Sequence, residues 1–96
     1  MQNLSEIKTT LAIHKARLFK KYGLRQLGIF GSYARTQQTD QSDIDILVDF
    51  EKPVGIEFID LANELEKILQ TKVDLVSKNG LKPKYFQSIA EELNYV

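Results

Sequence analysis

The chain has 96 residues, of which 43% are hydrophobic, and this size and composition suit one compact domain, residues 1–96, with one hydrophobic core. Thirteen Lys and Arg residues balance thirteen Asp and Glu residues, so the chain has no overall positive field with which to hold nucleic acid. The absence of Cys excludes disulfides and thiolate metal sites.

The sequence shows no sign of a targeting or membrane segment. Its first ten residues, MQNLSEIKTT, lack the apolar core of a signal peptide. No apolar run approaches the roughly 18 residues that a membrane-spanning helix needs. We therefore expect a soluble, cytoplasmic protein that has no membrane partner and does not bind nucleic acid directly.

The first part of the chain is expected to form a helix and then a strand. Apolar residues recur at helical spacing from Leu4 to Tyr22, with Ser5 as the N-cap and Gly23 as the C-terminal stop. The short segment LRQLGIF, Leu24 to Phe30, predicts a strand that ends at the turn formed by Gly31 and Ser32.

The rest of the chain alternates between strands and helices. Strict alternation of apolar residues predicts a strand over Asp43–Phe50, and helical spacing predicts a helix from about Phe58 to Gln70. A third strand is expected over Lys72–Ser77, and a last amphipathic helix over Lys84–Leu93. Interleaved strands and helices indicate the α/β class, with a βαβ unit if the second and third strands are parallel.

Three aspartates are the candidate metal ligands. Residues two apart in a strand share a face, so Asp43 and Asp45 project side by side with Cβ atoms roughly 6.5 to 7 Å apart. Like charges this close require a positive partner, and hard oxygen ligands favour Mg²⁺ or Mn²⁺. Asp74 becomes a third ligand if its strand lies beside the strand of Asp45, and two ions could then share the three carboxylates.

The Gly31–Ser32 turn is the candidate anion site. Gly31 permits a sharp turn and a close backbone approach, and Ser32 is expected to cap a short helix whose N–H groups face outward. Arg35 follows one turn later, where it could reach a polyphosphate. A triphosphate bridged between these donors and two Mg²⁺ ions would balance the charge of the aspartates.

Each of these features alone also has an ordinary structural explanation. Two acids often lie on the solvent face of a surface strand, and Ser42 with Asp45 matches a capping box that would begin a helix. The β-rich residues that follow favour the strand. An EF-hand is excluded, because its loop would need Gly at Val48 and Glu at Val54. The joint occurrence of the turn, the paired acids and a third acid on the next strand favours function.

The combined pattern resembles a known family. Gly31 and Ser32, ten residues, and the DID of Asp43 to Asp45 resemble the G-S-x10-D-x-D signature of the nucleotidyltransferases typified by DNA polymerase β. GIFGSYAR, SDIDILVDF and the tail LKPKYFQSIAEELNYV resemble the minimal nucleotidyltransferases, or MNT proteins, which are encoded beside HEPN-domain partners. The resemblance implies a palm-like α/β fold with a small mixed β-sheet and flanking helices.

The sequence departs from the family pattern at one position. The Arg of the GSYAR segment is commonly followed by Gly, whereas Thr36 stands here. Because a β-branched residue disfavours positive φ, we expect the loop from Thr36 to Gln41 to take another path. The nucleotide-binding role of Arg35 depends on the path of this loop.

The resemblance also implies a mechanism. Asp43 and Asp45 would hold two Mg²⁺ ions, while Gly31 and Ser32 bind the β- and γ-phosphates of ATP. Asp74 would bind the second metal and act as the base for an incoming hydroxyl. In MNT/HEPN pairs that hydroxyl belongs to a tyrosine of the HEPN toxin, so the protein would be an antitoxin and a protein adenylyltransferase.

Three alternatives remain open at the level of sequence. The acceptor could be a small molecule such as an aminoglycoside, although the chain has no additional domain to bind it. The protein could be a non-catalytic subunit that binds nucleotide and neutralises its toxin by contact. A template-directed or tRNA-directed polymerase is disfavoured by the neutral charge and the lack of a thumb-like helical region.

Overall fold

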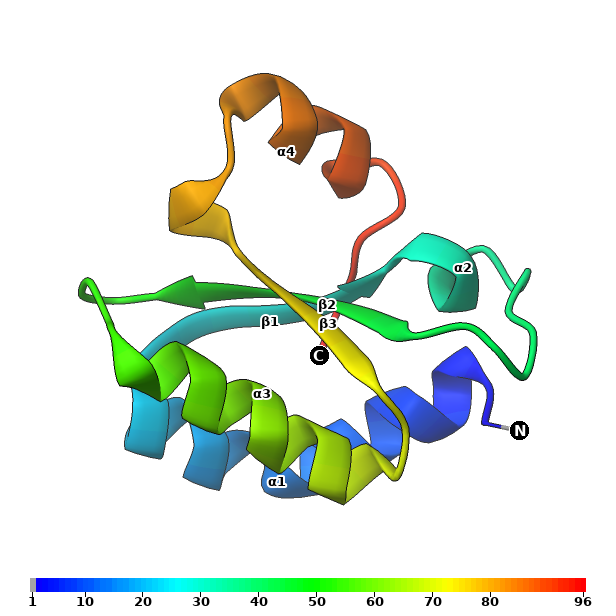
Figure 1. Ribbon diagram of the computed structural model, residues 1–96, viewed down its shortest axis with the longest axis horizontal. Coiled ribbons are helices and arrows are strands. Elements are labelled where there is room, and N and C mark those ends of the chain that lie inside the picture. The colour runs from blue at the N-terminus through cyan, green and yellow to red at the C-terminus, as the bar shows by residue number, and fades with distance from the viewer. Residues whose placement is uncertain (1) are drawn as a thin grey trace.

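The computed structural model describes residues 2–96 and shows one sheet with helices on both of its faces (Figure 1). Within these residues no helix is long and apolar enough to cross a membrane. In chain order the elements are α1 (Leu4–Tyr22), β1 (Leu24–Phe30), α2 (Gly31–Ala34), β2 (Ile44–Phe50), α3 (Ile56–Leu69), β3 (Val73–Ser77), the 3₁₀ turn η1 (Lys78–Gly80), α4 (Pro83–Ala90) and β4 (Asn94–Tyr95).

The sheet is small and mixed, as the family resemblance implied. Its strand order is β3-β2-β1-β4. β1 is antiparallel to both β2 and β4, whereas β2 and β3 are parallel and are joined through α3. The α/β class and the βαβ unit expected from the sequence are therefore confirmed.

The two faces of the sheet have different surroundings. Helices α1 and α3 cover one face, and α4 lies on the other side (Figure 1). The alternating apolar residues of β2, Ile44, Ile46, Val48 and Phe50, all belong to the buried core with residues of α1 and α3. Since successive side chains of a strand point to opposite faces, Asp45 lies on the α4 side. One face thus stabilises the fold and the other carries the acids.

Helix α1 begins at a different cap from the one expected. The N-cap is Asn3, whose Oδ1 accepts a hydrogen bond of 2.9 Å from the Glu6 N–H. Glu6 Oε1 accepts in return from the Asn3 N–H at 3.2 Å, which completes a capping box. The prediction of Ser5 was wrong, because the extended backbone of a cap occurs at Asn3. Gly23, with φ 66°, ends the helix as predicted.

Several other boundaries were also displaced. β2 and β3 begin one residue later than predicted, so Asp43 immediately precedes β2. The last helix ends at Ala90 and not at Leu93, and the chain then forms β4, which the sequence analysis missed. β4 has only two residues and depends on pairing with the edge of β1, so no local periodicity in the sequence predicts it.

The capping box supports a direct stability test. We expect Asn3→Ala to lower the free energy of unfolding by about 1 kcal/mol, because the Glu6 N–H loses its acceptor. Ser5→Ala, inside the first turn, should change it by no more than about 0.5 kcal/mol. Urea unfolding of both variants measures the difference, and a larger loss in Ser5→Ala would contradict the assignment.

Candidate active site

Strand pairing places two of the three predicted acids side by side. In the parallel pair of β2 and β3, Asp45 lies opposite Asp74. Asp43 stands one residue before β2, two positions from Asp45, and is exposed like Asp74. Asp45 is only partly exposed. The acid-bearing ends of the two strands therefore form one negatively charged edge of the sheet.

The electrostatics of this edge centre on Asp45. Burial, then the charge and hydrogen bonding of Asp74, then the charge of Asp43 raise the pKa of Asp45 to about 6. The positive charge of Arg35 acts in the opposite direction. A carboxyl whose pKa rises for these reasons lacks a sufficient cationic partner. The cluster would be stabilised by a cation or by a proton.

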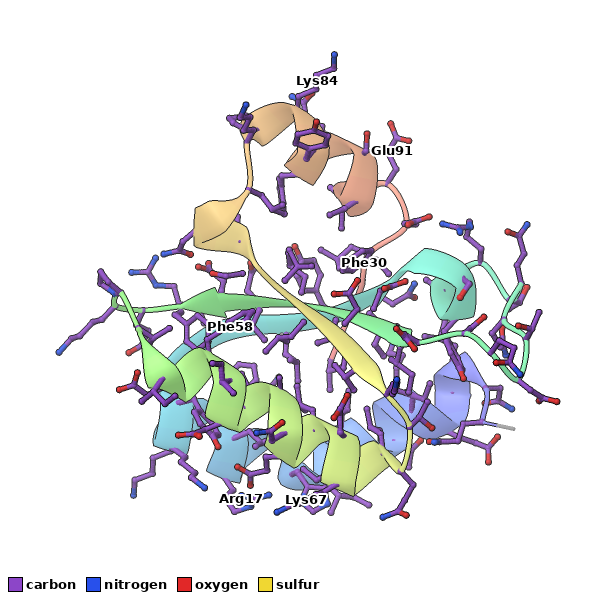
Figure 2. The ribbon with its side chains drawn as sticks, in the orientation of Figure 1. Arg17, Phe30, Phe58, Lys67, Lys84 and Glu91 are labelled. Carbon is purple, nitrogen blue, oxygen red and sulfur yellow. The ribbon has the colours of Figure 1, made fainter. Side chains whose placement is uncertain are left out.

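Gly31 joins the turn to the acids by direct approach. Its backbone has φ 75°, in the left-handed region, and a Cβ built there would lie 1.9 Å from Asp45 Oδ2. A side chain at this position would therefore be both strained and in collision with the carboxylate. Phe30, the preceding residue, pairs with Asp45 across β1 and β2 and lies between the sheet and α4 (Figure 2).

The turn after Gly31 differs from expectation in its capping. Helix α2 has Phe30 at its N-cap position with no side-chain cap, so Ser32 does not cap it as predicted. Ser32 lies inside the single helical turn, and its carbonyl accepts a hydrogen bond of 2.8 Å from the Gln37 N–H. A cap must precede the helix in extended backbone, and Phe30 is the residue with that conformation.

The backbone at Thr36 does adopt positive φ, contrary to the steric preference on which the expected change of loop path rested. Thr36 adopts φ 56° in spite of its branched side chain. Its hydroxyl donates a hydrogen bond of 2.6 Å to the Arg35 carbonyl, and its N–H donates to the Tyr33 carbonyl at 3.3 Å. These local bonds offset the steric cost of the left-handed conformation. Arg35 thus remains at the site, as the C-cap of α2.

Sequence reasoning missed one residue of this site, Glu92. Its Oε2 lies 2.7 Å from the Arg35 Nη1, and its Oε1 accepts a hydrogen bond of 3.0 Å from the Gly31 N–H. These contacts with Arg35 and Gly31 lower the pKa of Glu92. Glu92 follows Gly31 by 61 positions and Arg35 by 57 positions in the sequence, so no local pattern indicates that they meet.

The donor set has the chemistry of a divalent-cation site but is not closed around an ion. Carboxylate oxygens suit Mg²⁺, and burial together with the charges of Asp74 and Asp43 raises the pKa of Asp45. Among residues 2–96, however, no three His, Cys, Asp or Glu side chains are already gathered closely enough to hold a metal. Binding an ion would require Asp43, whose side chain is exposed, to turn toward Asp45, which already interacts with Asp74.

Two surface hollows help to place the site. One of about 280 Å³ is bordered by Asp43 together with Ser42, Thr71 and Lys72, and so adjoins the acids. A more apolar hollow of about 510 Å³ is lined by Phe50, Phe58 and Ser77 among others. Phe50 and Ser77 are the last residues of β2 and β3, so this hollow lies at the opposite end of those strands from Asp45 and Asp74.

Comparison with known proteins agrees with this geometry. Residues 14–94 match the family model described as polymerase beta, nucleotidyltransferase. The chain belongs to this nucleotidyltransferase family. The predicted family and the predicted nucleotidyltransferase fold are therefore confirmed.

Its relatives by sequence span the whole chain. Protein adenylyltransferase MntA of Thermococcus cleftensis is 43% identical over 97 residues, which cover 100% of this chain and 98% of MntA. A Methanocaldococcus jannaschii protein, provisionally named a protein adenylyltransferase, is 47% identical over 98 residues, and the alignment covers 100% of both chains. The nucleotidyltransferase described here is thus a homologue of protein adenylyltransferases.

Solved structures show the same fold. A structure provisionally described as a minimal nucleotidyltransferase superposes with a TM-score of 0.74 at 30% identity, covering 94% of this chain and 93% of the other. A toxin–antitoxin complex with AMP-PNP gives a TM-score of 0.73 at 27% identity, over 86% of this chain and 69% of the other. The structural likeness therefore extends to a chain that was solved with a nucleotide analogue.

The close approach of Gly31 to Asp45 yields a test. Gly31→Ala should lower the free energy of unfolding by more than about 1 kcal/mol, because the new Cβ is strained and displaces the carboxylate. Gly80→Ala is the matched control, since a Cβ there meets nothing within 4 Å, and it should stay within about 0.5 kcal/mol. Equal urea midpoints for the two variants would contradict the packing described.

The raised pKa of Asp45 predicts a pH dependence. Between about pH 4 and pH 6 the native protein holds a proton on Asp45 that the unfolded chain has released, so the contribution of Asp45 to the free energy of unfolding falls as pH rises through this window. After allowance for solvent screening, Asp45→Asn should be about 1 kcal/mol more stable than the wild type at pH 7 and equal to it near pH 4.

The measurement is urea unfolding across pH 4 to 8 without divalent ions. Asp60→Asn, which removes an exposed acid of α3, is the control for the loss of one negative charge. If Asp45→Asn runs parallel to the wild type at every pH, the account of Asp45 is wrong.

Proposed function

We propose that this nucleotidyltransferase transfers AMP from ATP to a tyrosine hydroxyl of a partner HEPN toxin and thereby acts as its antitoxin. The observation that carries the proposal is the contact between Gly31 and Asp45, with Asp74 beside it. It joins a turn suited to phosphate with carboxylates suited to Mg²⁺ in one place. The homology to protein adenylyltransferases supports AMP as the transferred group.

Asp43, Asp45 and Asp74 would hold two Mg²⁺ ions. When bound, the ions supply positive charge to the phosphate oxygens and to the entering and leaving oxygens of the reaction. The raised pKa of Asp45 agrees with this role, because a cation would stabilise a carboxylate that is partly buried and lies close to the charges of Asp74 and Asp43.

Residues of this chain would bind the phosphates and accept the proton of the acceptor hydroxyl. The backbone of Gly31 and the hydroxyl of Ser32 would bind the β- and γ-phosphates of ATP, and Arg35 would add a positive charge nearby. Asp74 would accept the proton of the acceptor hydroxyl, whose oxygen attacks the α-phosphorus in line. The bond from that phosphorus to the bridging oxygen breaks, and pyrophosphate leaves with the electron pair.

The choice of partner rests on the neighbours in structure. A complex described as toxin–antitoxin MntA-HpeT gives a TM-score of 0.70 at 26% identity, over 86% of this chain. Helix α4 contains no buried residue, and its Tyr85 is 62% exposed. Such a helix has apolar surface to offer a partner as well as to the sheet. We place the pair in the cytoplasm, where ATP and Mg²⁺ are at hand.

Intact-mass spectrometry of a HEPN protein co-expressed with this chain tests the proposal. Incubation with the chain, ATP and Mg²⁺ should add one or more AMP masses to the partner. We expect the gain to vanish with Asp43→Ala plus Asp45→Ala, because the phosphates lose their metal ligands. It should slow by about 100-fold or more with Asp74→Asn, which removes the base.

Asp60→Asn is the matched control, because it removes an equal charge from the exposed face of α3, and it should transfer AMP at the wild-type rate. A stable complex that gains no AMP would refute catalysis and leave an antitoxin that works by binding alone. AMP transfer to a small hydroxyl compound in preference to the partner would refute the choice of acceptor.

A further inference from the structure

The C-terminal segment from Glu92 to Val96, here called the C-terminal strap, lies across the turn that the proposed function assigns to phosphate. Glu92 Oε1 accepts a hydrogen bond of 3.0 Å from the Gly31 N–H, and Glu92 Oε2 forms an ion pair of 2.7 Å with Nη1 of Arg35. One carboxylate therefore bridges a backbone donor and a charged donor. Both belong to the group that would bind the polyphosphate of ATP.

The strap is fixed in place by contacts independent of Glu92. Asn94 and Tyr95 form β4, which pairs with Ile29 and Gly28 of β1. The Val96 N–H donates to the Leu27 carbonyl at 2.9 Å. Leu93 packs so closely on Gly28 that a Cβ there would lie 2.8 Å from Leu93 Cδ1. These contacts hold Glu92 against the turn.

A carboxylate and a phosphate make the same demands on these donors. Each offers negatively charged oxygens that accept from N–H groups, and two anions close together repel. The charge of Arg35 also reaches the acid cluster, where it opposes the rise in the pKa of Asp45. While Glu92 holds Arg35, it neutralises the positive charge that the phosphates need and keeps a negative charge at the turn.

We propose that Glu92 is an internal competitor of the ATP phosphates, so that nucleotide binding requires Glu92 to leave Gly31 and Arg35 and loosens the C-terminal strap. This inference rests on the proposed function, since it names how the same site is regulated. The strap thus acts as a built-in inhibitor whose displacement is coupled to nucleotide. By linkage, whatever displaces the strap strengthens ATP binding, and ATP favours its displacement.

Calorimetric titration of ATP with Mg²⁺ into the wild type and Glu92→Gln tests the competition. The variant keeps the shape of the side chain and removes its charge, so ATP should bind about five-fold more tightly. A factor of about five corresponds to the loss of one partly exposed charge interaction. Glu91→Gln is the matched control. Glu91 is exposed and points away from the sheet at the end of α4 (Figure 2), and ATP should bind this variant as it binds the wild type.

Hydrogen exchange of the wild type gives a second measurement that depends on no variant. ATP with Mg²⁺ should speed the exchange of the Val96 amide, whose bond to Leu27 holds the strap. Unchanged or weaker ATP binding by Glu92→Gln, or unchanged or slower exchange at Val96, would overturn the proposal and make Glu92 a residue that positions Arg35. If ATP binds none of the three proteins, the proposed function itself fails, and this inference fails with it.

Discussion

The arrangement of the site depends on one close approach, that of the Gly31 backbone to the Asp45 carboxylate. A Cβ at Gly31 would lie 1.9 Å from Asp45 Oδ2, so the two strands β1 and β2 can bring their ends together only with glycine there. The contact sets the turn against the acids and pushes Asp45 into partial burial beside Asp74. The raised pKa of Asp45 and the position of the turn follow from the same geometry.

The rest of the fold serves to hold that contact. The alternating apolar residues of β2 pack on α1 and α3, which leaves the opposite face for Asp45 and fixes its direction. The parallel pairing of β2 and β3 then sets Asp74 in register with Asp45. On the far edge, β4 pairs with β1 and brings Glu92 to the turn. Positive and negative groups from the middle and the C-terminal end of the chain thus meet at one place.

The sequence predicted those parts that have a local or strongly spaced signal. Alternation located β2, and the Gly31–Ser32 spacing to Asp43 and Asp45 indicated the family. Parts that depend on tertiary contact were not predictable, since β4 exists only through β1, and Glu92 meets Gly31 only when the strap is paired. The positive φ of Thr36 was not predicted, because the steric preference of a branched side chain was considered without the hydrogen bonds that offset it.

We expect Asp45, held against Gly31, to be part of a metal-dependent nucleotide site. Electron paramagnetic resonance of Mn²⁺, titrated with and without a non-hydrolysable ATP analogue, tests it most directly, because Mn²⁺ takes the oxygen ligands that suit Mg²⁺. The account predicts that the wild-type chain binds Mn²⁺ in the presence of the analogue, and that Asp45→Asn does not. Equal Mn²⁺ binding by the wild type and Asp45→Asn would contradict it.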